Sequence, residues 1–368
     1  LALLLLKQLT HDERFAAAIR REDAELFIAA ALLHDLGHWP FCHPIEDIRL
    51  RNVPSHERFA NAFLREGELG DVLRNDWGID PGRLVALLSE PPRDPAMRIL
   101  ASMLSGPIDI DKMDYLFRDS LHAGVPYGRH FDQQRLIGSL CLNAAGDGLA
   151  ISDKGKTATE LIVFARYVMF SEVYWHHGVR SATAMLQRAF SLLHDALDLE
   201  VLFRMTEPEM ITRLREAAGD GPAGELLSGL FGPTRRLYKR LAQYSFFEER
   251  ALYQRLARRP YPWLTSCAER LAGLAGAALG TAIAPHEILF DAPPVEREVE
   301  FDVDIYYAKE HRYRSLSEVS PVVRTLAREQ FDDYVKRVRI FAHPRVALPL
   351  RGLKNLADLV NQAIDQTE

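Results

Sequence analysis

A histidine followed by an aspartate, His34–Asp35, stands where an apolar segment, residues 24–33, ends in a glycine-containing turn. Two further histidines, His38 and His43, follow closely. Imidazole and carboxylate groups are ligands of divalent metal ions in hydrolytic sites, and neighbouring histidines can transfer protons or contact phosphate. Burying a carboxylate without a partner is costly, and a metal ion would offset that cost. We therefore interpret these residues as a metal-dependent hydrolytic site rather than a capped helix end with a solvated aspartate.

A second acidic segment, residues 108–119, predicts a helix with chemistry along one face. Asp111, Tyr115 and Asp119 follow one another at intervals of four residues, which places them on the same side of a helix. An acidic helix face is usually exposed to solvent. Here, however, the face combines carboxylates with a phenol, and the opposite face of the same predicted helix is apolar. Asp111 is therefore a candidate second carboxylate on the metal.

The pair His56–Glu57 follows Ser55, whose residue type often caps a helix. Alone, the pair indicates a helix start at which the dipole favours the glutamate. Beside a metal centre, it would form a proton shuttle in which Glu57 holds the imidazole of His56 in one tautomer.

Farther along the chain, Arg166 and Tyr174 lie two turns apart on one face of a predicted helix. Arginine suits a polyphosphate because its planar guanidinium donates to paired oxygens. From the residues alone, an ordinary surface arginine with a buried tyrosine is an equal alternative.

The elements that must position these residues are mainly helical. Apolar periodicity and capping signals predict helices over residues 1–9, 23–33, 56–65, 96–104, 108–122 and 157–197, the last as one helix or two, and interrupted helices over 207–279. A β-hairpin is predicted over residues 136–151, around a Gly-Asp-Gly turn.

The pattern changes near the C-terminus. Residues 299–305 alternate between apolar and acidic, which predicts a strand, and a helix from Pro321 to Tyr334 and a second strand over 335–341 follow. The predicted fold class is mainly α, with a helical core, an embedded β-hairpin and a small C-terminal α/β lobe. The length of 368 residues favours two domains, placed at 1–200 and 201–368.

The composition is that of a globular protein, with 48% apolar and 26% charged residues. A net charge of −6 argues against general nucleic-acid binding, although it would not reveal a local basic pocket. Three widely spaced cysteines form no metal-binding or disulfide pattern, which favours a reduced, cytoplasmic protein. The apolar run at residues 1–6 is too short to span a membrane.

Three stretches in this order resemble the HD-domain superfamily of phosphohydrolases: LHDLGHWPFCH at residues 33–43, His56–Glu57, and DIDKMDYLFRD at residues 109–119. The branch they most resemble is the deoxynucleoside triphosphate triphosphohydrolases, the dGTPase and dNTPase enzymes, with specific similarity over about residues 24–180. The resemblance implies an HD-domain helical core. It also implies hydrolysis of a deoxynucleoside triphosphate to a deoxynucleoside and inorganic triphosphate.

The resemblance also implies roles for individual residues. His34, Asp35 and Asp111 would hold a divalent metal ion, which could be Mn, Mg, Fe, Ni or Zn. The catalytic residues would be His38, His43, His56 and Glu57. The substrate-binding residues would be Lys112, Tyr115, Asp119, Arg166 and Tyr174.

The chain also departs from the family pattern. The family's upstream Arg-x-x-His segment, which supplies a fourth ligand, is expected just before Leu1. Phe170 stands where a histidine is common and Trp175 where a polar residue is common, so the choice of nucleotide is left open.

Two alternatives remain open. An HD phosphohydrolase could act on a monophosphate, a cyclic nucleotide or an alarmone, because the metal centre specifies only attack at phosphorus. The second alternative is a nucleotide-sensing HD module with weak turnover. Its only support is that the upstream histidine is missing from this sequence. By resemblance, we also expect a homo-oligomer that binds a nucleotide substrate and a nucleotide effector.

Overall fold

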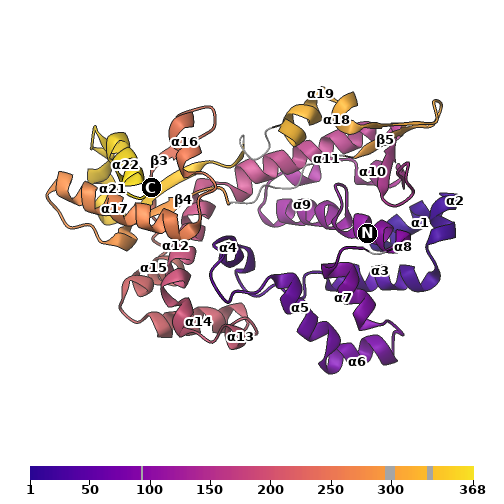
Figure 1. Cartoon of the computed structure of the whole chain (residues 1–368), viewed down its shortest axis with the longest axis horizontal. Helices are drawn as coiled ribbons and strands as arrows, with labels where there is room; N and C mark the ends of the chain where they lie inside the picture. The colour runs from indigo at the N-terminus through magenta and orange to yellow at the C-terminus, as the bar shows by residue number, and fades with distance from the viewer. Residues whose placement is uncertain (93, 295–302, 330–334) are drawn as a thin grey trace. The chain divides into compact units, whose positions relative to one another are not determined.

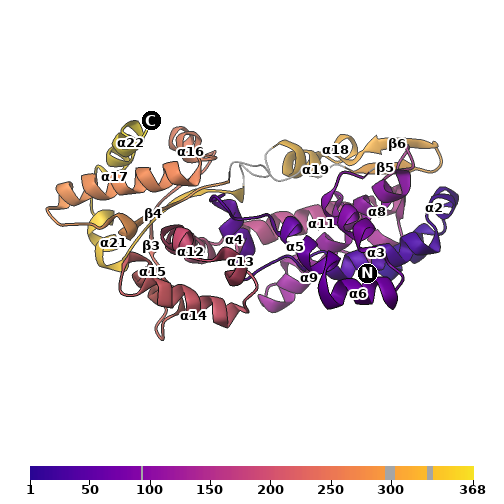
Figure 2. The same cartoon turned by 60° about the horizontal axis from the view of Figure 1, so that its bottom comes forward.

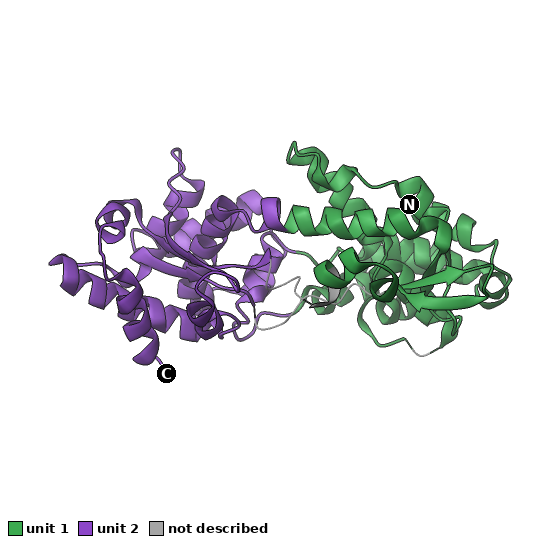
Figure 3. Cartoon of the chain, turned by 90° about the horizontal axis from the view of Figure 1, so that it is seen from above, with its two compact units in different colours: residues 1–38, 55–170, 298–331 green, residues 39–54, 171–297, 332–368 purple. Residues whose placement is uncertain are grey.

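The computed structural model describes residues 1–92, 94–294, 303–329 and 335–368. The chain forms two compact units (Figure 3). Unit 1 contains Leu1–His38, Ser55–Phe170 and Glu298–Phe331, and unit 2 contains Trp39–Pro54, Ser171–Arg297 and Asp332–Glu368. The units are interleaved along the chain, whereas the predicted division at residue 200 is sequential. That division stays a prediction.

Unit 1 is built on helices that the sequence predicted (Figure 1). They are α1 (Ala2–Leu9), α3 (Arg21–Leu33), α5 (His56–Arg65), α8 (Pro95–Ser105), α9 (Ile110–His122) and α11 (Lys156–Met169). The shorter helices are α2 (Glu13–Ala18), α6 (Gly67–Asn75), α7 (Pro81–Ser89) and α10 (Gln133–Ile137). Helix α3 packs against α1, α7 and α8, and α9 packs against α8 and α11. This packing brings the end of α3 and the start of α9 together.

A small sheet completes unit 1. Strands β1 (Leu140–Leu142) and β2 (Leu149–Ser152) form the predicted hairpin, and Gly146 takes a positive φ of 74° in its turn. Strand β5 (Asp304–Tyr307) pairs parallel to β2, and β6 (Arg312–Ser315) pairs antiparallel to β5.

Unit 2 is built around a three-stranded antiparallel sheet of β3 (Lys239–Tyr244), β7 (Val338–Ala342) and β4 (Ile288–Asp291), in that order. Helix α17 (Tyr261–Leu279) contacts α22 (Leu356–Asp365) and β4, and α12 (His177–Leu193) also contacts β4 (Figure 2). The remaining helices are α4 (Cys42–Asp47), α13 (Leu199–Leu202), α14 (Glu207–Ala218), α15 (Pro222–Phe231), α16 (Arg250–Leu256) and α21 (Pro344–Arg351).

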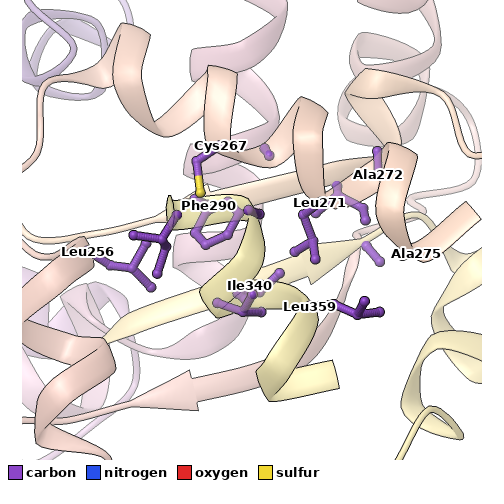
Figure 4. Close-up of a cluster of buried hydrophobic side chains, with 14 of the residues drawn as sticks. Leu256, Cys267, Leu271, Ala272, Ala275, Phe290, Ile340 and Leu359 are labelled. Carbon is purple, nitrogen blue, oxygen red and sulfur yellow. The ribbon is translucent and has the colours of Figure 1, made fainter. Parts of the chain in front are cut away.

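The core of unit 2 lies between this sheet and its helices. Leu271 of α17, Phe290 of β4, Ile340 of β7 and Leu359 of α22 belong to one buried apolar cluster (Figure 4). Neighbouring residues of a strand point to opposite faces, so Phe290 and Ile340 face this cluster while Asp291 and Arg339 face the other way. Strand β3 lies within the segment predicted as interrupted helices, and that local prediction was wrong.

The C-terminal part of the chain is the main difference from the predicted arrangement. The two predicted strands do not share a lobe, because β5 joins the sheet of unit 1 and β7 is the central strand of unit 2. The predicted helix begins as α19 (Pro321–Val323) and continues as a π-helical turn, Arg324–Glu329. Residues 299–302 and 330–334 of these predictions lie outside the described residues. The mainly α fold class with a small β part is confirmed.

Among the described residues, no helix combines the length and the apolar character that a membrane span requires.

Candidate metal centre

Three predicted ligands lie together in unit 1. His34 ends α3, Asp35 follows it, and Asp111 lies in the first turn of α9. The Nε2 atom of His34 is 3.3 Å from an oxygen of Asp35 and 3.4 Å from an oxygen of Asp111. The three potential ligand atoms all lie within 4.8 Å of one another. The end of α3 and the start of α9 therefore bring together residues that are far apart in the sequence.

The imidazole of His34 is oriented by its own helix. Its Nδ1 lies 3.2 Å from the carbonyl oxygen of Ala31, so a proton on Nδ1 would be donated to that carbonyl. In that tautomer the lone pair of Nε2 faces the two carboxylates, as a metal ligand requires. The hydrogen bond with Asp111 raises the pKa of His34 above its ordinary 6.5, although burial opposes this. A metal ion would compete with the proton for the same nitrogen.

The donor set fits a divalent metal ion. The carboxylates of Asp35 and Asp111 both approach His34 Nε2 and remain partly exposed, so a cation could reach them and relieve their mutual repulsion. Mixed imidazole and carboxylate ligation suits several divalent metal ions.

A tight turn places two further histidines near this trio. A Cβ atom on Gly37 would lie only 1.9 Å from the carbonyl oxygen of His56, so only glycine allows the turn to approach α5 this closely. The rings of His38 and His56 stack with centroids 4.0 Å apart. His38 Nδ1 is 3.3 Å from Asp35 and His56 Nε2 is 3.2 Å from Glu57. Each of these imidazoles therefore has a carboxylate that can orient it.

A pocket of about 760 Å³ opens beside the trio. His34, Asp35, Asp111, Tyr115 and Asp119 line it together with apolar residues of α1 and α3. This volume is typical of a small-molecule site. The predicted face of α9 therefore points into one cavity with the candidate ligands.

Sequence reasoning missed two residues of this pocket, Asp114 and Arg118. They form an ion pair with a nitrogen–oxygen distance of 2.5 Å and both line the cavity. Their spacing of four residues on a predicted helix was the available signal. Four aspartates and a single arginine line the pocket, so its charge is predominantly negative.

The half-buried Tyr115 pairs with the buried Arg166. The Tyr115 hydroxyl is hydrogen-bonded to Arg166, whose guanidinium lies over the ring of Phe170 at 5.2 Å. Burial raises the pKa of Tyr115 to about 12, although Arg166 opposes this. Tyr115 is therefore a neutral phenol at ordinary pH.

Lys112 is engaged inside the protein. Its Nζ donates to Asp109 at 2.6 Å and to the carbonyl oxygen of Gly106 at 3.0 Å. These bonds give Lys112 a structural role at the start of α9, and its predicted phosphate contact stays a prediction.

Two predicted site residues, His43 and Tyr174, belong to unit 2. His43 lies on α4 with its Nδ1 3.7 Å from Glu46, and Tyr174 ends the π-helical turn Phe170–Tyr174. The stretch around His43 is anchored in unit 2 by stacking of Trp39 on Phe203, with ring centroids 4.1 Å apart. Their roles in the site stay predictions.

The chain is similar to known protein families and to several known proteins. The profile of the HD domain matches residues 2–93, and that of the HD associated region matches residues 131–347. The Bacillus subtilis protein YwfO is 36% identical over 178 residues, which are 48% of this chain and 38% of that protein. The Methanocaldococcus jannaschii protein MJ1154 is 27% identical over 354 residues, 94% of this chain and 69% of that protein. The chain thus spans well under half of YwfO.

Two solved structures are similar in fold. A hypothetical protein of Aquifex aeolicus superposes with a TM-score of 0.68 at 25% identity, covering 92% of this chain and 82% of that one. A phosphohydrolase of Bacteroides thetaiotaomicron superposes with a TM-score of 0.64 at 21% identity, covering 93% and 84%. The HD profile includes His34–Asp35, and the associated-region profile covers more than half of the chain. This chain therefore belongs to the HD-domain family whose members carry the HD associated region.

Proposed function

We propose that the protein is a metal-dependent phosphohydrolase that cleaves a deoxynucleoside triphosphate to a deoxynucleoside and inorganic triphosphate. The observation that carries this proposal is the convergence of His34, Asp35 and Asp111 beside a pocket lined by Tyr115 and Asp119. A fold shared with a protein named a phosphohydrolase, and the resemblance of the motifs to dNTP triphosphohydrolases, support the same reaction.

The residues take the following parts. His34, Asp35 and Asp111 would hold the metal ion, which when bound polarises a phosphoryl oxygen and lowers the pKa of a bound water. His38 and His56, oriented by Asp35 and Glu57, would accept and return the proton of the attacking water.

The pocket face of α9 would hold the sugar. The neutral hydroxyl of Tyr115 and the carboxylate of Asp119 can hydrogen-bond to the deoxyribose, and Arg166 fixes the position of the phenol. By resemblance, His43 and Lys112 would contact phosphate and Tyr174 would contact the sugar.

The test is a product analysis. The purified protein is incubated with Mn²⁺ and each deoxynucleoside and ribonucleoside triphosphate, and the products are separated by anion exchange. We expect tripolyphosphate and the free deoxynucleoside, and we expect Asp111→Asn to abolish both. Asp71→Asn, an exposed aspartate on α6 of the same unit, is the matched control. Release of orthophosphate or pyrophosphate alone would contradict the proposal.

A substrate with fewer phosphates is a second candidate, and the charge of the pocket favours it. Four aspartates face one arginine in the lining, and Lys112 is already bound to Asp109. Nucleoside monophosphates and cyclic nucleotides therefore belong in the same panel. Alarmones, which carry more phosphates, are added to it as the remaining alternative substrate of an HD phosphohydrolase. Arg166→Ala should reduce kcat/KM far more for a triphosphate than for a monophosphate. A metal-loaded protein that binds nucleotide without turnover would instead be a sensing module.

We further propose, from the resemblance, a cytoplasmic homo-oligomer that responds to a nucleotide effector. Light scattering after size exclusion, with and without nucleotide, measures the assembly. A monomer under both conditions would contradict it.

A further inference from the structure

Asp109 is completely buried although it carries a carboxylate, and it lies two residues before the candidate ligand Asp111. It is the N-cap of α9. We propose that Asp109 is a positioning residue of the metal centre, which fixes the first turn of α9 and thereby the carboxylate of Asp111. This inference rests on the metal centre of the proposed function, but not on the identity of the substrate.

Both carboxylate oxygens of Asp109 are used at this helix start. One accepts from the backbone N–H of Lys112 at 2.7 Å, and the other accepts from the Nζ of the same residue at 2.6 Å. The Nζ also donates to the carbonyl oxygen of Gly106, at the end of α8. Asp109, Lys112 and Gly106 therefore form a closed clip between the end of α8 and the first turn of α9.

The clip encloses the backbone of Asp111, because Asp111 lies between Asp109 and Lys112. The turn before it leaves little room for adjustment: a Cβ atom on Gly106 would lie 2.2 Å from the carbonyl oxygen of Ser102. The Asp111 side chain itself is partly exposed, so its position depends on the backbone that carries it.

Asp109 differs from the other aspartate N-caps of unit 1. Asp94 at the start of α8 and Asp80 at the start of α7 each cap a backbone N–H, yet neither is fully buried. A fully buried carboxylate needs a charged partner, and here that partner is Lys112. An exposed cap stabilises its helix, whereas this one also sets where a metal ligand stands. Residues that orient metal ligands typically change metal affinity about 10- to 100-fold when they are replaced.

The experiment compares Asp109→Asn with the matched control Asp94→Asn. Mn²⁺ affinity is measured by the EPR signal of free Mn²⁺, well below the unfolding midpoint of each variant, and thermal unfolding is recorded separately. We expect Asp109→Asn to weaken Mn²⁺ binding about tenfold or more. Asp94→Asn should leave the unfolding temperature nearly unchanged and change Mn²⁺ affinity by no more than about twofold, because asparagine caps a helix about as well as aspartate.

A second variant covers the case in which Asp109→Asn does not fold. Asp109→Ser keeps a good N-cap but removes the partner of the Lys112 ammonium. It should also weaken Mn²⁺ binding. Adding Lys112→Met should restore thermal stability, because it removes the unpaired ammonium, but it should not restore the affinity, because methionine cannot make the bond to Gly106. Wild-type affinity in a folded Asp109 variant would overturn the inference. A wild-type protein that binds Mn²⁺ yet hydrolyses no nucleotide would contradict only the proposed function.

Discussion

Two sites, one in each unit, hold their aspartates in opposite ways. In unit 1, the side chains of Asp35 and Asp111 are 65% and 41% exposed, and their carboxylates line a pocket beside the imidazole of His34. In unit 2, Asp291 is 2% exposed and accepts from Arg180 at 2.6 Å and 3.0 Å, with a nitrogen of Arg339 4.0 Å away. Carboxylates open to a cavity can bind a ligand, whereas the buried and paired carboxylate of Asp291 stabilises the fold of its own unit.

The same contrast appears in the apolar packing. The sheet of unit 2 has one face covered by the apolar cluster of α17, α22 and its neighbours (Figure 4). In unit 1, α3 and α9 also bury apolar residues, but other residues of the same helices line a cavity of about 760 Å³. We therefore expect substitutions at the pocket of unit 1 to change binding, and substitutions in the core of unit 2 to change stability.

The largest expected effect is that of Asp111→Ala. Removing a metal ligand should reduce hydrolysis on the order of 10³-fold. Stability should stay the same or rise slightly, because a repulsion between carboxylates is removed. Steady-state kinetics and urea unfolding on one preparation measure both. Asp71→Ala is the control, and a large loss of stability in Asp111→Ala would contradict the separation of roles.

Asp291→Asn should have the opposite profile. It leaves two buried guanidinium groups, Arg180 and Arg339, without their carboxylate, which costs about 3–5 kcal/mol of unfolding free energy. Mn²⁺ affinity of the folded protein should not change. Chemical denaturation measures the unfolding free energy, and Mn²⁺ titration measures the metal affinity. A loss of unfolding free energy below about 1 kcal/mol would show that the pairing of Asp291 with the arginines contributes little to stability.

Leu271→Ala tests the apolar half of the comparison. Leu271 is fully buried in the cluster of unit 2, so its truncation should cost about 3 kcal/mol. Leu348→Ala, on an exposed side chain of α21, should change stability by less than about 0.5 kcal/mol. Equal effects of the two substitutions in urea unfolding would argue against this core.

The smallest expected effect is a pH dependence in unit 1. Burial alone would raise the pKa of Asp23, but the hydrogen bonds from Arg83 and from the backbone of Arg20 lower it below its ordinary 3.8. The ionised form is therefore favoured by folding, so this stabilisation is present above pH 3.8 and is lost as the pH falls through the folded pKa. Its size is about 1 kcal/mol, because Arg83 is partly exposed. Between pH 5 and 3, the unfolding free energy measured in urea should fall less for Asp23→Asn than for the wild type. Equal decreases in the two proteins would show that Asp23 is not the source of this pH dependence.

Local signals in the sequence predicted the helices of unit 1 well. Ser55 marks the start of α5, and the four-residue spacing of Asp111, Tyr115 and Asp119 predicts one face of α9. The long-range pairing was not predictable in this way. Strand β5 pairs with β2, which lies about 150 residues earlier, and no local pattern specifies that partner.

The same limit applies to the site. The motif strings identify His34, Asp35 and Asp111, but the bond of Lys112 to Gly106 depends on how α8 packs against α9. A lysine beside a phosphate site and a lysine in a clip look alike in a sequence. The fold shows that Lys112 forms the clip, and its phosphate contact stays a prediction.

The most direct test of the metal centre is anomalous diffraction from crystals soaked in Mn²⁺. The account predicts a peak in unit 1 about 2.0–2.3 Å from His34 Nε2 and from one carboxylate oxygen each of Asp35 and Asp111. A peak at His38 and His56 instead, or no peak at saturating Mn²⁺, would contradict it.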